Sequence, residues 1–556
     1  MCTSRQITNA LRRRLFAKSR SEIRSMMRGY RYLKQSNQLH IIEDLIQFLR
    51  DQPLHDVLAT RNIPLVIWGK ALTSAELIIR QRLSLKYLDI HKALLIASSY
   101  QGGKVAAPIP HVWRRHIENN GFLVNHKLCE RLWKVELIKQ SLYGMAEAII
   151  SITKVYHGLL FTLVRNEPYI YFCDLISSNL PQNHFPYKSY CILNWYIYGG
   201  ISKPNSKIIK HSVKDRGDLP DGNFTITYQA CPVPNILTAR NALKYTLNLC
   251  RQFIIIIHSL IQNKWWNILI YREAVVSLRT RHIEPNLLAK EYWFHNSQAY
   301  PPLWTHELSA KGIQIIYYFY STNCDPFPRE DGSRPFITLY SIMNWPTIYV
   351  WNSLQADFIR KTKSCSSQIV ECGPIWFTDS VQFEPSGEQY IAAFDVQPMR
   401  SSRYANLCTA QDYYNPKNSI KFIQDIVESA NDLGIVVCFK RKRDIGTLVH
   451  PLYRNFLNTL KNFSNIRIVD PGVSAFKLIE HSSGVVSMPF TSTALIASAQ
   501  GKASLYYDPK ILFSATDPAA SDVPIVNQKR FLKEWMIKLK NSNQASTCYN
   551  TDKISY

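Results

Sequence analysis

The clearest pattern of apolar and polar positions lies in the last third of the chain, where short apolar runs alternate with segments of helical period. The apolar runs predict strands over Tyr390–Val396, Gly434–Lys440, Ile466–Val469, Gly484–Ser487 and Ala503–Tyr507. The segments between them predict helices over Ser419–Leu433, Leu452–Asn462, Ala475–His481 and Ala494–Gln500. Alternating strands and helices are typical of a parallel sheet with right-handed crossovers, so this region predicts a Rossmann-like domain.

The earlier part of the chain mixes the same two periods in a less regular order. Helical period predicts helices over Arg114–Asn120, Leu128–Ser151 and Thr238–Ile261. Short apolar runs predict strands over Tyr169–Cys173, Ile268–Tyr271 and Gly312–Phe319. This part is therefore expected to form a second α/β domain.

These patterns also predict the domain boundaries. The 556 residues are too many for a single hydrophobic core. We expect a basic extension over residues 1–40, an α/β domain over 41–370, a Rossmann-like domain over 371–540 and a disordered tail over 541–556.

Two apolar stretches deserve a separate test as membrane spans. Phe253–Ile261 is too short to cross a bilayer, and Ala146–Val164 contains Glu147, Lys154 and His157. Both stretches are therefore predicted to be buried helices.

The net charge of +25 calls for an acidic partner, and much of it lies near the N-terminus. Before Gln35 the one acidic residue is Glu22, and the basic residues are Arg5, Arg12, Arg13, Arg14, Lys18, Arg20, Arg24, Arg28, Arg31 and Lys34. Apolar residues between them predict basic amphipathic helices, which bind anionic membrane surfaces. The same pattern suits nucleic acid or a solvated helical face.

The turn before the last predicted helix is a candidate phosphate site. Thr491, Ser492 and Thr493 follow a predicted strand and precede a helix of small residues. Their hydroxyls either cap the helix or, together with its first N–H groups and the positive end of its dipole, bind an anion.

A basic cluster and a histidine occur in the same domain. Lys440 ends a predicted strand, Arg443 follows it, and His450 with Pro451 opens the next helix. The carboxyl ends of parallel strands meet at one edge of a sheet, where open α/β folds bind ligands. His450 is therefore either a structural histidine or a phosphate ligand. Lys440 and Arg443 are expected to bind the same donor phosphate.

Two motifs resemble those of known families. The run MPFTSTA, followed by YYDP, resembles the signature of bacterial polysaccharide biosynthesis proteins named for a PFTS motif. That resemblance extends from about Val105 to Asp508 and includes Phe294–Trp304 and Phe319–Asn323. More distantly, the pairing of an HP motif with a downstream Ser/Thr motif is similar to bacterial sialyltransferases, polysialyltransferases and capsule Kdo transferases.

The more distant resemblance implies a GT-B-like fold, in which two Rossmann-like domains face a cleft, and a CMP-activated sugar as donor. It also implies that His450 and Pro451, together with the turn formed by Thr491, Ser492 and Thr493, contact the nucleotide and phosphate of the donor. No acidic pair followed by glycine matches the base motif of the sialyltransferases, so the resemblance does not supply a catalytic base.

Transfer to a hydroxyl needs a base to accept its proton. Asp174 and Glu273 each follow a predicted strand of the first domain, and His295 is a further candidate. A carboxylate at the end of a strand also serves as a cap or as an ion-pair partner, so this role stays open.

Several other classes lack their usual motifs. The chain has no GxGxxG fingerprint, P-loop or GxSxG elbow in the required context, and its 12 cysteines show no zinc spacing. We therefore expect neither an organic cofactor nor a metal, with donor binding that is independent of metal.

Together with the two α/β domains, these resemblances imply a glycosyltransferase of surface polysaccharide synthesis, for capsule or lipopolysaccharide. Its expected partners are a nucleotide-sugar, a glycan or lipid-linked glycan acceptor and an anionic membrane surface. The expected location is the cytoplasm, at the inner face of the cell membrane. The alternative is a basic nucleic-acid-binding protein without enzymatic activity, although no recognised module for that function is visible.

Overall fold

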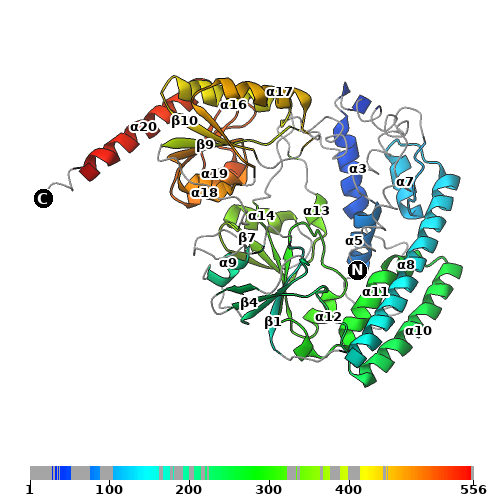
Figure 1. Cartoon of the computed structure of the whole chain (residues 1–556). Helices are drawn as coiled ribbons and strands as arrows, with labels where there is room; N and C mark the ends of the chain where they lie inside the picture. Colours follow the sequence, from blue (N-terminus) through cyan, green and yellow to red (C-terminus); the bar gives the residue numbers. More distant parts are fainter. Residues whose placement is uncertain are drawn as a thin grey trace.

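The computed structural model describes residues 28, 32–33, 35–36, 38–51, 75–87, 104–161, 167–175, 180, 192–198, 206–214, 219–221, 224–321, 334, 338–362, 367–375, 389–398, 413–441, 446, 449–471 and 473–551. Within these residues the chain forms two predominantly parallel sheets covered by helices (Figure 1). The predicted α/β class with two Rossmann-like sheets is confirmed. Most of the predicted basic extension, residues 1–27, lies outside the described residues.

The C-terminal sheet has the strand order β11-β10-β9-β12-β13-β14, and every neighbouring pair is parallel. Its strands are β9 (Tyr390–Phe394), β10 (Val436–Lys440), β11 (Ile466–Val469), β12 (Gly484–Ser487), β13 (Ala503–Tyr507) and β14 (Ile525–Val526). The central strands β9 and β12 are buried throughout, which explains why their sequences read as continuous apolar runs. All the strands predicted here are present, and β14 adds a short edge strand.

The helices of this half are α16 (Pro416–Asn431), α17 (Pro451–Thr459), α18 (Ala475–Glu480), α19 (Ser492–Ala499) and α20 (Lys529–Thr551). Helix α16 begins where the Asn415 side chain accepts a hydrogen bond from the Asn418 N–H and Pro416 occupies the first turn.

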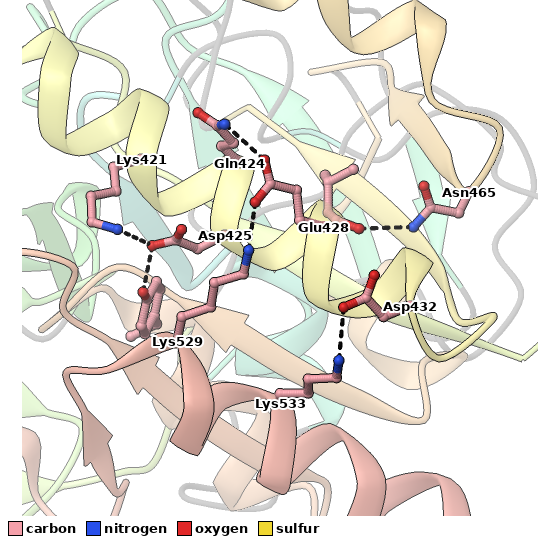
Figure 2. A network of polar contacts seen from close by, with 10 residues as sticks. Lys421, Gln424, Asp425, Glu428, Asp432, Asn465, Lys529 and Lys533 are labelled. Carbon is pink, nitrogen blue, oxygen red and sulfur yellow. Dashed lines mark hydrogen bonds and ion pairs between the residues drawn. The ribbon is translucent and has the colours of Figure 1, made fainter.

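Helix α20 packs against α16 through polar contacts, shown in Figure 2. Lys529 lies 2.5 Å from Glu428, and Lys533 lies 2.7 Å from Asp432. Its apolar face reaches β12, where a Cβ on Gly484 would lie 2.8 Å from the Leu539 side chain. The helix continues to Thr551, across most of the segment predicted to be a disordered tail, because the sequence there contains no proline or glycine to end it.

The N-terminal sheet has the strand order β3-β4-β2-β1-β5-β6-β7-β8, parallel except for the pair β3 and β4. Its strands are β1 (Tyr169–Phe172), β2 (Ile208–His211), β3 (Leu219–Asp221), β4 (Phe224–Tyr228), β5 (Glu291–His295), β6 (Gln314–Tyr318), β7 (Thr347–Val350) and β8 (Gln368–Glu371). The predicted strands that became β1 and β6 are confirmed. The change from one sheet to the other falls between β8 and β9.

The helices of the N-terminal half are α3 (Leu39–Asp51), α5 (Ala75–Tyr87), α7 (His111–Asn119), α8 (His126–Phe161), α9 (Ile192–Tyr198), α10 (Ala239–Ile261), α11 (Trp265–His282), α12 (Thr305–Ser309), α13 (Thr338–Ser341) and α14 (Ser353–Thr362). The predicted strand Ile268–Tyr271 is wrong, because these residues lie inside α11. Helix α11 is buried on most of its circumference, and a short apolar run taken from such a helix has the same pattern as a buried strand.

Helices α8 and α11 approach each other closely. A Cβ added to Gly144 of α8 would lie 2.1 Å from a ring carbon of Tyr271 on α11, so only glycine fits at this crossing. Helix α10 packs on both, and Figure 1 shows the three helices side by side at the edge of the N-terminal half.

The predicted burial of Phe253–Ile261 and Ala146–Val164 is wrong for many of their side chains. Phe253–Ile261 and the described part of the second stretch, residues 146–161, are helical, but Ile254 is 66% exposed and Ile261 is 78% exposed. Ile149 of α8 is 67% exposed. The physical reason is that α8 and α10 form an outer layer, so only one face of each can pack on α11. Of the described helices, none has the combination of length and apolar character needed to span a bilayer.

The two halves are in direct contact. Arg334, between β6 and α13, binds both carboxylate oxygens of Asp517 in the C-terminal half, at 2.7 and 2.5 Å from one guanidinium nitrogen. One continuous hydrophobic core also includes Phe358 of α14 and Phe476 of α18.

Candidate functional site

Each sheet changes its direction of winding at one pair of neighbouring strands. From β9 the chain adds β10 and β11 on one side, and then β12, β13 and β14 on the other. From β1 it adds β2 and β4 on one side, and then β5 to β8 on the other. The connections that leave such a central pair diverge, and ligands of open α/β sheets bind at the carboxyl ends of those strands. The candidate sites are therefore the ends of β9 and β12 and the ends of β1 and β5.

The turn after β12 leads directly into helix α19. Thr491 is the N-cap residue by backbone position, but its side chain makes no capping hydrogen bond and instead donates to the Met488 carbonyl at 2.8 Å. The Thr493 hydroxyl contacts the buried Ser487 hydroxyl at 2.8 Å, and Ser492 is half-buried at the first helical position. The side chain at the N-cap position thus leaves the first N–H groups of α19 for another acceptor, which favours anion binding over plain capping.

His450 and Pro451 begin helix α17. The His450 N–H donates to the Pro398 carbonyl at 2.9 Å, which ties the residue to the segment that follows β9. Its Nδ1 accepts the Leu452 N–H at 3.3 Å and so caps the helix. In a neutral imidazole whose Nδ1 accepts, the proton is on Nε2, so the second ring nitrogen is a donor. The same histidine can therefore cap the helix with one nitrogen and donate to a phosphate with the other.

Lys440 lies at the end of β10, where it is buried. Its Nζ donates to the Pro471 carbonyl at 3.1 Å and to the Arg441 carbonyl at 3.4 Å. The structure therefore places this ammonium group against the loops that follow β10 and β11. Arg443 lies outside the described residues.

Asp395 follows β9 and was not among the residues that the sequence singled out. It is 3% exposed and the Tyr453 hydroxyl of α17 donates to its Oδ2, while Oδ1 has no hydrogen-bond partner among the described residues. Burial raises the pKa of Asp395 to about 7, against the opposing effects of the Tyr453 hydrogen bond and the Arg441 charge. The one signal in the sequence is an acidic residue that ends a buried strand.

In the N-terminal half, Asp174 and His295 lie at the ends of the neighbouring strands β1 and β5. Asp174 is exposed and has a φ of +62°, a left-handed conformation that aspartate tolerates better than most residues. The pKa of Tyr318, at the end of β6, is raised by burial and then by the charge of Asp174. The His295 ring lies 5.6 Å from that of Tyr318, so the three side chains share one edge of the sheet.

His295 is poorly suited to accept a proton. Its Nδ1 accepts the Ser297 N–H at 3.0 Å, so the neutral ring carries its proton on Nε2. The ring stacks on Tyr320 with centroids 4.5 Å apart, and burial lowers the pKa of His295 to about 4. This histidine is a hydrogen-bond donor at neutral pH.

The prediction that Glu273 follows a strand is wrong, because the residue lies within helix α11. Its carboxylate forms an ion pair of 3.0 Å with the buried Arg82 of α5. The prediction depended on the mistaken strand Ile268–Tyr271, and the structure does not bring Glu273 together with Asp174 and His295.

A cavity of about 140 Å³ lies at the opposite edge of the C-terminal sheet. It is lined by Gln389, Tyr390, Ile391, Gly434, Ile435, Ser483, Leu539 and Lys540. These residues mark the amino ends of the strands, so the cavity is separate from the candidate site. Across the described part of the chain, no three His, Cys, Asp or Glu side chains gather as metal ligands.

Residues 249–536 match the family described as "Polysaccharide biosynthesis PFTS motif protein". This range contains β5 to β14, both candidate turns of the C-terminal half and the PFTS run itself, Pro489–Ser492. No curated protein matches the chain.

The chain is also similar to several solved structures. The wall teichoic acid polymerase TagF, in a variant form, is 13% identical and has a TM-score of 0.36, covering 74% of this chain and 90% of its own. Trehalose-6-phosphate synthase OtsA is 11% identical with a TM-score of 0.33, covering 67% and 91%. The UDP-GlcNAc 2-epimerase of Methanocaldococcus jannaschii is 10% identical with a TM-score of 0.32, covering 67% and 92%. TM-scores this low do not establish a common fold, so the architecture rests on the two sheets themselves.

The raised pKa of Asp395 predicts a pH-dependent stability. Between the ordinary value of 3.8 and about 7, the native state holds a proton that the unfolded state has lost, so stability falls as pH rises through this window. The free energy of unfolding of the unmodified protein should decrease from about pH 5 to about pH 8. In Asp395→Asn this decrease should be smaller by a few kcal/mol. Thermal unfolding over this pH range measures it.

Asp357→Asn is a suitable control, because Asp357 is an exposed residue of α14 that pairs with Arg360. This control should keep the pH dependence of the unmodified protein. An Asp395→Asn protein with the same pH dependence as the unmodified protein would show that Asp395 is ionised in the native state throughout.

Proposed function

The chain belongs to the polysaccharide biosynthesis PFTS motif family, and on this premise we propose that it is a glycosyltransferase that moves a sugar from a nucleotide-sugar to a glycan acceptor. The observation that carries the proposal is that the family's own motif, Pro489–Ser492, forms the turn into α19 at the point where the C-terminal sheet reverses. A helix N-terminus at that position is suited to the diphosphate or phosphate of a sugar nucleotide.

The donor's phosphate would lie between two helix N-termini. The first-turn N–H groups of α19 and the Ser492 hydroxyl would bind it from one side, and the Nε2–H of His450 would donate from the other. The hydroxyls of Thr491 and Thr493 bond within the turn and hold its shape. We further propose a CMP-linked sugar as donor, on the likeness of the His450–Pro451 pair and this turn to the sialyltransferase motifs.

Asp174 would act as the base in the N-terminal half. In the transfer step the acceptor oxygen forms a bond to the anomeric carbon, and the bond from that carbon to the donor's phosphate oxygen breaks. The acceptor proton passes to the Asp174 carboxylate, and the phosphate leaves with the electron pair. Among the three candidates, Glu273 is engaged with Arg82 and His295 has its acceptor nitrogen occupied.

The proposed biological setting is surface polysaccharide synthesis, for capsule or lipopolysaccharide, at the inner face of the cell membrane. A lipid-linked acceptor would explain why a chain with a net charge of +25 works beside an anionic surface.

The decisive first experiment is calorimetric titration of the protein with CMP, UDP and GDP. We expect binding to at least one of them, with CMP the tightest. Salt-sensitive RNA binding without binding of any nucleotide would overturn the transferase proposal in favour of a nucleic-acid-binding protein.

His450 variants separate phosphate binding from helix capping. His450→Asn keeps a side chain that caps helices well, whereas His450→Ala removes both the cap and the Nε2 donor. We expect both to weaken nucleotide binding by roughly 1.5–3 kcal/mol, the range of a charge-assisted hydrogen bond, while only His450→Ala also lowers the melting temperature.

Ser492→Ala should weaken binding less than either change, because the backbone N–H groups of α19 remain. A His450→Asn protein that binds every nucleotide as tightly as the unmodified protein would remove His450 from the site.

Asp174→Asn tests the base. Asparagine tolerates the left-handed backbone of residue 174, so the fold should be kept while the proton acceptor is lost. We expect kcat to fall by about a hundredfold to ten-thousandfold with donor affinity unchanged. Sugar transfer by Asp357→Asn should stay normal, and a larger loss of kcat in His295→Gln than in Asp174→Asn would contradict the assignment.

Donor binding is proposed to be independent of metal, because helix N-termini supply partial positive charge at the phosphate and the Nε2–H of His450 supplies a hydrogen-bond donor. Sugar transfer should therefore persist after treatment with a chelator. Loss of activity that Mg²⁺ or Mn²⁺ restores would refute this part of the proposal.

A further inference from the structure

Helix α10 presents an exposed apolar stripe along its whole length. The exposed residues of this stripe recur every three or four positions, as Leu243, Leu247, Cys250, Ile254, Ile257 and Ile261. This is the spacing of a single helix face. The opposite face, with Tyr245, Leu249 and Ile256, is buried.

Helix α8 presents a second stripe of the same kind. Its exposed members follow the same spacing, as Val135, Ile138, Leu142, Ile149, Tyr156 and Leu160. Met145 and Ile152 continue the series and are half-buried. Scattered exposed apolar residues are ordinary, but two continuous stripes on neighbouring helices are not.

The two helices are adjacent and antiparallel. The Tyr245 hydroxyl of α10 donates to the Ser151 hydroxyl of α8 at 2.7 Å, and Tyr156 and Thr246 are 3.4 Å apart. Helix α10 runs antiparallel to α11, because Asn241 donates to the His282 carbonyl and Asn267 donates to the Ser259 hydroxyl. Helix α11 runs parallel to α8, because Tyr271 lies against Gly144 and Arg279 donates to Ser151. The second half of α10 therefore runs beside the first half of α8. Figure 1 shows both helices at the outer edge of the molecule, on the side away from the C-terminal sheet. We call the exposed stripes of α8 and α10 the outer helix face.

The charge along this face has one sign. Helix α10 has no Asp or Glu in its 23 residues, and its exposed charged side chains are Arg240, Lys244 and Arg251. These residues follow one flank of its apolar stripe. Every carboxylate of α8 is already paired within the molecule, in the ion pairs Arg114–Glu130, Lys139–Glu136 and Arg272–Glu147.

The charge of the outer helix face decides which of three partners fits it, namely a second copy of the chain, the basic segment before Gln35 or an anionic bilayer. A second copy of the chain would bring the arginines and lysines of two α10 helices together, and like charges at an interface cost free energy. The basic segment before Gln35 carries charge of the same sign and is excluded for the same reason. An anionic bilayer surface satisfies both features, since it accepts the apolar stripe at the acyl boundary and neutralises the cations at the headgroups.

We propose that the outer helix face docks the protein on an anionic lipid bilayer, with α8 and α10 lying in the plane of the interface. The docking proposal rests on the proposed function in one respect, because the lipid-linked acceptor of that function is the reason for the protein to dock. Helix α10 lies on this view against the membrane and does not cross it.

The test measures binding of the full-length protein to phosphatidylcholine vesicles with and without phosphatidylglycerol. The apolar variant combines Ile254→Gln, Ile257→Gln and Ile261→Gln, with Ile537→Gln of α20 as a matched exposed control. We expect binding only to the anionic vesicles, weakened about tenfold or more in the apolar variant and unchanged in the control.

The charge variant combines Arg240→Gln, Lys244→Gln and Arg251→Gln. It should also bind about tenfold or more weakly, and its remaining binding should depend less on salt. Equal binding of all variants would overturn the proposal. A dimer that the apolar variant dissociates, measured by light scattering, would overturn it in favour of a second copy.

The nucleotide titrations on the same variants keep the two proposals distinguishable. If the substitutions weaken lipid binding but the protein binds no nucleotide, the docking surface is supported and the transferase proposal is rejected. If the protein binds nucleotide normally but binds no lipid, the transferase proposal is supported and the docking surface is rejected.

Discussion

The reversal of winding in each sheet is the constraint on which the candidate site depends. A parallel strand can be added on either side of those already present, and at β9 and at β1 the chain uses both sides in turn. The loops that leave the two strands of each central pair, β9 with β12 and β1 with β5, therefore run in opposite directions. The carboxyl ends of these strands stay open between the loops, where a ligand can bind. Asp174, Asp395 and the turn into α19 all owe their position to this reversal.

The local polar chemistry follows from where those ends lie. In the turn after β12 the threonine hydroxyls bond to a carbonyl and to the buried Ser487, so they shape the backbone instead of capping α19. At His450 the two ring nitrogens have different tasks, because a capping Nδ1 fixes the proton on Nε2. Burial shifts the pKa of an acid and of a base in opposite directions. It raises the pKa of Asp395, which is then partly protonated near neutral pH, and it lowers the pKa of His295, which is then neutral.

The sequence predicted the C-terminal sheet well because its central strands, β9 and β12, are buried on both faces and because turn residues separate its strands. The same reasoning failed at Ile268–Tyr271, where a helix buried on most of its circumference gives the same short apolar run. That mistake is why Glu273 was wrongly predicted to lie at the end of a strand. The position of Asp395 at the end of a buried strand was its one signal in the sequence. That position does not reveal its burial against Tyr453, which is 58 positions away in the chain. The outer helix face was missed because a long apolar run does not reveal how much of its surface a neighbour covers.

The docking of α20 also has a consequence for the way the protein is made. Each ion pair between α16 and α20 joins residues 101 positions apart, and α20 follows all the other described helices in the sequence. At about 5–20 residues per second, a ribosome needs roughly 5–20 seconds to pass from one helix to the other. Throughout that interval Trp535 and Leu539, which cover the surface around Gly484 in the folded protein, have not yet been synthesised. An apolar part of the C-terminal half, around Gly484, therefore stays uncovered until α20 has been synthesised.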